Sequence, residues 1–210
     1  MRTPELIALL AADIRPARPI GRSLLIAGLG GGIAAGLLFV ALVGVRSDLP
    51  GALANPWVAF KFLFTAVMVV TALIGATRLL RPEPTALPVK LLLVPMVLLA
   101  AATAVDAVVT PRALWARAAT GISPLTCLAM IIMTSLLPVF SLLWAARAGA
   151  PRYPGKAGAA AGLAGSAMGA WIFALYCPND SALFVAIWYV IAMIIVAVCA
   201  SIIGIRLIKW

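Results

Sequence analysis

Long apolar stretches alternate with short polar breaks along the chain from about residue 23 onward. A helix of about 20 apolar residues, rising about 1.5 Å per residue, crosses roughly 30 Å of hydrocarbon. The breaks carry Pro, Gly and charged residues, as in "RSDLPGALANP" and "RAGAPRYPGK", which helices avoid or expose. The pattern predicts six membrane-spanning helices, at residues 23–45, 57–80, 88–110, 121–144, 157–176 and 182–206.

The composition agrees with this interpretation, because 65% of the 210 residues are hydrophobic and only 10% are charged. A soluble domain could not cover so much apolar side chain with so little polar surface. We therefore predict an all-α polytopic membrane bundle of six transmembrane helices over residues 23–210, preceded by a cytoplasmic helix and linker over residues 1–22. The first apolar stretch is too long and too rich in Gly for a cleaved signal peptide, so we expect it to be retained.

The basic residues predict the orientation of the bundle. With the N-terminus in the cytoplasm, twelve of the 16 Lys and Arg residues lie on the cytoplasmic side, where such residues are retained. Both termini are therefore predicted to be cytoplasmic. Anionic lipid of the inner leaflet attracts this charge distribution, so the net charge of +10 does not require direct binding of nucleic acid.

The N-terminal segment "MRTPELIALLAADIRPARPIGR" predicts a short amphipathic helix over residues 4–14. Leu6, Ile7, Leu10 and Ile14 fall on one face of that helix. An isolated helix of this length is marginal in water, so its apolar face needs a partner. The membrane surface, the protein's own loops and a groove on another protein are the alternatives.

Two of the three cysteines are predicted to lie at one depth near the outer face. Cys177 follows the fifth span, and Cys127 lies about six residues into the fourth span. Cys199 lies roughly 26 Å along the sixth helix, and we expect it to be a small buried hydrophobic residue. The outer thiols can form a disulfide, hold a soft metal ion or be buried without further role, and these alternatives stay open.

The segment "CPND" predicts a tight turn between the fifth and sixth spans. Pro178 ends one helix, Asn179 and Asp180 favour the turn, and Asp180 or Ser181 caps the next helix.

Two ionisable residues, Lys61 and Asp106, fall inside predicted spans, within about four residues of the outer boundary. At that depth we expect their side chains to reach the interface and its solvent.

Small residues also recur every four positions, a spacing that lets helices approach closely. These are Gly28, Gly32 and Gly36, Gly158 and Gly162, and Gly165 and Gly169.

Several segments together carry a family resemblance: "PELIALLAADIRP" ahead of six spans, "SPLTCLAMI", "YCPNDSALFVAIWY" and the final "LIKW". In these the chain resembles the NrsF family of bacterial integral-membrane anti-sigma factors. The resemblance implies a protein of the bacterial inner membrane that is not an enzyme. It would hold an extracytoplasmic-function sigma factor through its N-terminal segment and release it under heavy-metal or oxidative stress.

The resemblance also implies roles for particular residues, namely stress sensing by Cys127 and Cys177, and sigma-factor binding by Leu6, Ile7, Leu10 and Asp13. Family members often carry histidine near the cysteines, whereas Tyr176 precedes Cys177 and the chain has no histidine. Two thiols make a poor zinc site, so we expect no resident cofactor. A soft heavy-metal ion bound transiently at Cys127 and Cys177, or thiol oxidation, suits them better.

Two other classes of protein are alternatives to a regulator. A small metal or ion transporter would carry polar residues deep in several spans, and these spans are nearly bare of them. A membrane thiol oxidoreductase would typically carry a Cys-x-x-Cys pair, which the sequence lacks.

Overall fold

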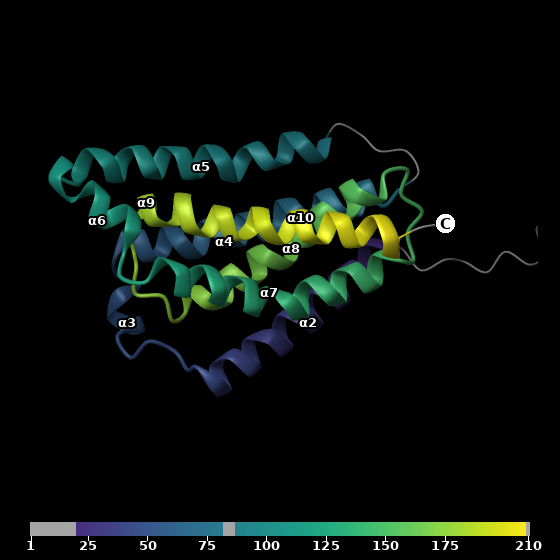
Figure 1. The fold of residues 1–210 in the computed structure, drawn as a ribbon, viewed down its shortest axis with the longest axis horizontal. Helices are drawn as coiled ribbons and strands as arrows, with labels where there is room; N and C mark the ends of the chain where they lie inside the picture. The colour runs from purple at the N-terminus through teal and green to yellow at the C-terminus, as the bar shows by residue number, and fades with distance from the viewer. Residues whose placement is uncertain (1–19, 82–86, 209–210) are drawn as a thin grey trace, which may run out of the picture.

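The computed structural model describes residues 20–81 and 87–208, and every regular element in them is helical. Figure 1 shows long helices running side by side, with short helical segments gathered at one end of the bundle. The long helices are α2 (Ile20–Leu42), α4 (Pro56–Leu79), α5 (Leu87–Val109), α7 (Pro124–Ala146), α8 (Pro154–Ala174) and α10 (Val190–Leu207). The short ones are α3 (Leu49–Ala52), a 3₁₀ turn (Arg112–Leu114), α6 (Trp115–Thr120), α9 (Ala182–Phe184) and a π-helical segment (Val185–Tyr189).

Six helical segments are long and apolar enough to cross a membrane, which confirms the predicted number. The last of them runs without a break through α9, the π-helical segment and α10, from Ala182 to Leu207. The helix boundaries differ from the predicted ones by a few residues. The short helices α3 and α6 were not predicted, since each is too brief to produce a periodic pattern.

Helix α8 lies at the centre of the bundle and packs against α10, α7 and α4. Its small residues allow this close approach, which confirms the predicted role of its glycines. A Cβ added at Gly165 would lie 2.8 Å from the backbone nitrogen of Val139 on α7, and one added at Gly158 would lie 2.5 Å from the carbonyl oxygen of Ala200 on α10. Backbone therefore meets backbone at these contacts, with no room for a side chain.

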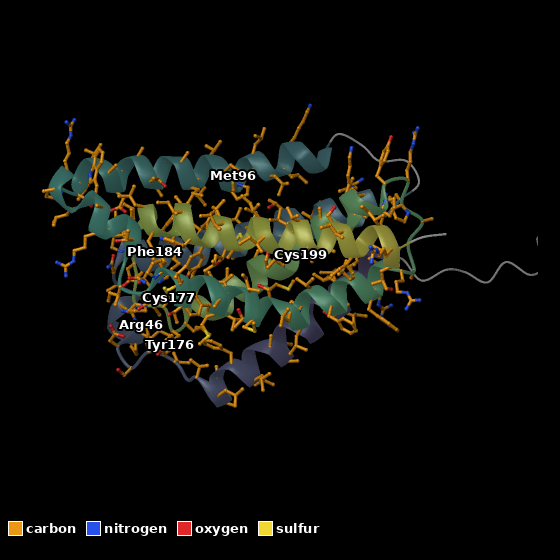
Figure 2. The ribbon with its side chains drawn as sticks, in the orientation of Figure 1. Arg46, Met96, Tyr176, Cys177, Phe184 and Cys199 are labelled. Carbon is orange, nitrogen blue, oxygen red and sulfur yellow. The ribbon has the colours of Figure 1, made fainter. Side chains whose placement is uncertain are left out.

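Helices α5 and α2 lie at opposite edges of the bundle, and α2 diverges from its neighbours toward its C-terminal end (Figure 1). Helix α5 packs mainly on α4, and α2 packs mainly on α7. Ile20 and Ile208, near the two ends of the described chain, pack in one apolar cluster. Cys127 and Cys177 belong to a separate cluster, and Cys177 lies at the other end of the bundle from Ile20 and Ile208 (Figure 2).

The glycine contacts of α8 generate a stability prediction. Replacing Gly165 by Ala places a methyl group 2.6 Å from Cγ2 of Val139, and overpacking of this kind costs about 1–3 kcal/mol. Gly30→Ala is the matched control, because nothing lies within 4 Å of its added Cβ. We expect the Gly165 variant alone to lower the thermal unfolding midpoint in detergent, followed by circular dichroism. Equal midpoints for the two variants would contradict the packing described above.

Candidate functional site

The turn between α8 and α9, residues 177–181, is the structural centre of the site and is called the CPND turn below. The Cys177 N–H donates to the carbonyl of Phe173 at 3.0 Å, and Pro178 then prevents further helix. Ser181 caps the next helix, because its hydroxyl accepts a hydrogen bond from the N–H of Leu183 at 3.2 Å. The predicted turn and its cap are therefore confirmed.

Cys127 and Cys177, which were predicted to lie at one depth, are in contact, with their sulfur atoms 3.9 Å apart. Both side chains are buried, and both thiols are free. Figure 2 shows Cys177 at one end of the bundle with Arg46, Tyr176 and Phe184, and Cys199 farther along α10. The prediction that Cys199 is buried was wrong: it is exposed on the surface of α10, since that helix is apolar on every side and the sequence does not show which side packs inward.

Asn179 connects the thiol pair to the start of α7. Its side-chain amide donates to the sulfur of Cys127 at 3.6 Å, and its Oδ1 accepts a hydrogen bond from the N–H of Ile122 at 3.1 Å. Gly121, with φ of +63°, leaves the space that Asn179 fills, because a Cβ there would lie 2.6 Å from Asn179 Oδ1. The thiol of Cys177 donates to the backbone carbonyl of Asn179 at 3.8 Å. One asparagine thus contacts both sulfurs.

Lys61 is fully buried and points into the CPND turn. Its Nζ donates to the carbonyl oxygens of Cys177 and Asn179 at 3.0 and 3.1 Å, and to Oδ1 of Asp180 at 2.9 Å. The prediction that solvent at the interface surrounds the Lys61 side chain was wrong, because three oxygens of the turn replace water around the ammonium group. The ammonium group therefore fixes the turn to α4.

Arg46, just after α2, contacts the same turn from the outside. One guanidinium nitrogen donates to the Cys177 carbonyl at 3.3 Å and to the Asp180 carboxylate at 3.1 and 3.2 Å. Its other nitrogens bind both oxygens of Asp48 at 2.7 Å. The hydrogen bonds with Asp48 raise the pKa of Arg46, against the effect of burial, and lower the pKa of Asp48. Arg46 is therefore a permanent cation that joins the end of α2 to the turn.

Asp106 links α5 to the CPND turn. Its Oδ2 accepts hydrogen bonds from the hydroxyl of Ser181 at 2.6 Å and from the N–H of Leu183 at 3.1 Å. The side chain is buried, so the prediction that Asp106 is solvated at the interface was also wrong. A carboxylate at a helix N-terminus is stabilised by the free N–H groups there, and these replace the solvent that the sequence had suggested.

The phenol of Tyr189 completes the surroundings of Cys177. The side chain is fully buried, and its hydroxyl has no hydrogen-bond partner, unlike every other buried side-chain nitrogen or oxygen in the described residues. Contact with the Cys127 thiol, the charge of Lys61 and the nearby Tyr189 hydroxyl all lower the pKa of Cys177, while burial opposes the shift. These surroundings make the Cys177 thiol easier to deprotonate than burial alone would allow.

The donor set fits a soft metal ion better than zinc. Among the described residues, no three His, Cys, Asp or Glu side chains form a group that could hold a metal. The two sulfurs alone are 3.9 Å apart, and two thiolates on a tetrahedral metal with bonds of about 2.3 Å lie about 3.8 Å apart. Two thiolates can thus bind one thiophilic cation with little movement.

The sequence prediction missed Asn179 as a thiol contact, together with Arg46 and Tyr189. The charges on Lys61 and Asp106 were the available signal, since an ionisable residue in a span marks a functional site by default. The predicted sigma-binding residues lie outside the described residues: Leu6, Ile7, Leu10 and Asp13.

The fold and the site define a class of protein: a six-helix membrane protein with two buried thiols and an ion-paired turn at one end. Comparison with known proteins then gives the family. The family described as NrsF, negative regulator of sigma F, matches residues 10–210, and the chain belongs to it.

Two relatives match along the full length of both chains. The anti-sigma-F factor NrsF of Caulobacter vibrioides is 33% identical over 217 residues. The probable anti-sigma-F factor NrsF of Azospira oryzae is 33% identical over 219 residues. No solved structure matches the chain.

The contacts of Lys61 generate the prediction for this site. Lys61→Met keeps an apolar side chain of similar size and removes the buried ammonium group, so that Asp180 and the Cys177 carbonyl keep only Arg46 and the Asn179 carbonyl loses its charged donor. Removing one partner of a buried ion pair costs about 3–5 kcal/mol, so we expect a large drop in the thermal midpoint in detergent. Lys90→Met, at an exposed position, is the control and should change little. If the two variants melt together, Lys61 does not hold the turn.

Proposed function

We propose that this protein is an anti-sigma factor of the bacterial inner membrane that holds an extracytoplasmic-function sigma factor in an inactive state. Cys127 and Cys177 act as its stress sensor, and binding of a heavy-metal ion or oxidation of the thiols releases the sigma factor. Membership of a family of negative regulators of sigma F supports the first part. The thiol pair at 3.9 Å is the observation that carries the second.

The topology of this proposal rests on charge and on the even number of spans. Six spans put both ends of the chain on one side of the membrane, and the basic residues favour the cytoplasm for that side. The thiol pair then faces the periplasm, where oxidants and metal ions arrive first. The sigma factor binds on the opposite side, at the N-terminal segment.

The chemistry at the sensor is simple in either case. A soft divalent cation replaces two thiol protons, which pass to solvent, and both sulfurs become thiolate ligands. A two-electron oxidant instead removes two protons and two electrons and joins the sulfurs in a disulfide. The sulfurs would then close from 3.9 Å to about 2.05 Å, which moves Cys177, Cys127 or both.

Movement at the sulfurs would be felt by several spans, because the CPND turn is bound to each of them. Lys61 ties the turn to α4 and Arg46 ties it to the end of α2, both through the Cys177 carbonyl. Helix α2 follows the N-terminal segment directly in the chain. A shift of α2 relative to α7 and α8 is therefore the route that we propose from sensor to sigma factor.

The energetic demand on the sensor is moderate. Changing a two-state protein from almost fully bound to almost fully released requires about 5.5 kcal/mol of differential stabilisation. Chelation by two thiolates or formation of a disulfide can supply several kcal/mol of that amount.

A metal or ion transporter and a membrane thiol oxidoreductase, the alternative classes, gain little support from the described residues. The buried charges of Lys61 and Asp106 both lie at the thiol end of the bundle and are hydrogen-bonded, so they do not line a path across the membrane. Transport of metal in vesicles, or reduction of a quinone, would nevertheless replace the regulatory proposal by one of those classes.

Release of the sigma factor tests the sensor. Membranes that contain the full-length protein and its bound sigma factor are treated with a two-electron oxidant or with Cd²⁺, and the freed sigma factor is measured after centrifugation. We expect the variant with Cys127→Ser and Cys177→Ser to bind the sigma factor normally and to release at least tenfold less of it. Cys199→Ser is the control and should behave as the unmodified protein. Full release from the double variant would refute thiol sensing.

The N-terminal residues are tested separately on the same membranes. Leu6→Ala with Leu10→Ala removes two large side chains from the proposed binding face, at about 1.5–3 kcal/mol for each one buried against a partner. We expect affinity for the sigma factor to fall by at least tenfold. Ala12→Ser, on the opposite side of the predicted helix, should leave affinity unchanged. Unchanged binding by the double variant would show that the inner loops hold the sigma factor instead.

A further inference from the structure

The buried hydroxyl of Tyr189 is an exception that requires a physical reason. Leaving a buried polar group without a hydrogen bond is costly, and native proteins rarely do so. A Phe at this position would fill the same space without that cost. In the described residues no other buried side-chain nitrogen or oxygen lacks a partner, so the bundle satisfies its polar groups well elsewhere.

The surroundings of Tyr189 exclude a simple solvent partner. The ring packs against Phe173 and Phe184, with ring centres 6.4 Å away in both cases, and the side chain is fully buried. It ends the π-helical segment Val185–Tyr189, a local irregularity that is frequent at functional sites. Tyr189 and both thiols belong to one buried cluster, so the nearby polar chemistry is that of the thiol pair. The backbone carbonyl of Phe173, whose ring packs on Tyr189, also accepts the N–H of Cys177.

The two sulfurs differ in the donors available to them. Cys127 accepts a hydrogen bond from the side-chain amide of Asn179 at 3.6 Å. Cys177 uses its own hydrogen to donate to the Asn179 carbonyl at 3.8 Å. While Cys177 is a thiol, it therefore has little need of a donor. When it loses its proton it becomes an acceptor only, and the free hydroxyl of Tyr189 is then the matching donor.

We propose that Tyr189 is a positioning residue of the sensor, whose hydroxyl donates a hydrogen bond to the Cys177 sulfur when both thiols bind a soft metal ion as thiolates. The Cys127 sulfur already has its donor, the side-chain amide of Asn179, in the resting state. The two thiol protons pass to solvent, and the hydrogen bond from Tyr189 forms only in the metal-bound state. The unsatisfied hydroxyl thus disfavours the resting state and favours the metal-bound one. This inference rests on the proposed function of the thiol pair.

Cd²⁺ is a suitable probe, because cadmium thiolates absorb in the ultraviolet through charge transfer from sulfur to metal. The full-length protein in detergent is titrated with Cd²⁺ in the presence of a competing chelator. We expect Tyr189→Phe to weaken Cd²⁺ binding by about 10- to 100-fold, the range found when a partner of a metal ligand is removed. The absorption band should also move to longer wavelength, since the thiolate loses a hydrogen bond that stabilises its electrons.

Tyr176→Phe is the matched control. Tyr176 adjoins Cys177 in the sequence but is half-exposed and packs on Phe39, so its variant should bind Cd²⁺ as the unmodified protein does. The thermal midpoint without metal is the second readout. We expect Tyr189→Phe to leave it unchanged or raised, because the substitution removes an unsatisfied buried group. A merely structural tyrosine would instead lower the metal-free midpoint.

The outcomes separate this inference from the proposed function. Equal Cd²⁺ affinity and band position in the unmodified protein and Tyr189→Phe overturn the role of Tyr189 and leave the thiol sensor intact. A lowered metal-free midpoint together with weaker binding also overturns it. A variant with Cys127→Ser and Cys177→Ser that still shows the cadmium band, or an unmodified protein without one, overturns metal binding by the thiols and this inference with it.

Discussion

The arrangement of the thiol end depends on one buried ammonium group. Lys61 is fully enclosed, and its charge is balanced by two carbonyl oxygens and the carboxylate of Asp180, all within 3.1 Å. A lysine deprived of water needs such a set of oxygens, and only a turn that directs its carbonyls inward provides it. The same geometry fixes the backbone of Cys177. The sulfur that meets Cys127 is therefore positioned by a charge on a different helix.

Because part of the bundle is rigid, a change at the CPND turn acts mainly on the helices at its edges. Along α8 the glycines bring backbones into direct contact with α7 and α10, so these three helices form a block that resists deformation. Helices α2 and α5 lie at the edges with fewer neighbours, and each is joined to the CPND turn by one charged side chain, Arg46 or Asp106. A change at the turn can therefore move the edge helices against the block more easily than it can bend the block.

Sequence reasoning predicted the spans and the common depth of the two cysteines, because span length and turn chemistry determine how far along the bundle a residue lies. It failed at Lys61, Asp106 and Cys199 for a common reason. Depth does not specify the direction of a side chain, and a helix that is apolar all round has no periodic pattern to indicate its inner face. Two of the three partners of Lys61 are backbone carbonyls, and the sequence does not show where a carbonyl points. Tyr189 was missed because a π-helical segment changes the register of the residues around it.

From the resting geometry, metal binding and oxidation require different movements of the two sulfurs. At 3.9 Å the sulfurs already have almost the spacing that two thiolates adopt on a tetrahedral ion, so chelation changes charge more than position. A disulfide requires the sulfurs to approach by almost 2 Å, while Lys61 and Arg46 hold the Cys177 carbonyl from two sides. Oxidation must therefore strain or displace these contacts, whereas a metal ion acts through the protons it removes and the hydrogen bonds it rearranges. In the sensor proposed above, metal binding and oxidation would therefore act on the same pair of thiols by two physical routes.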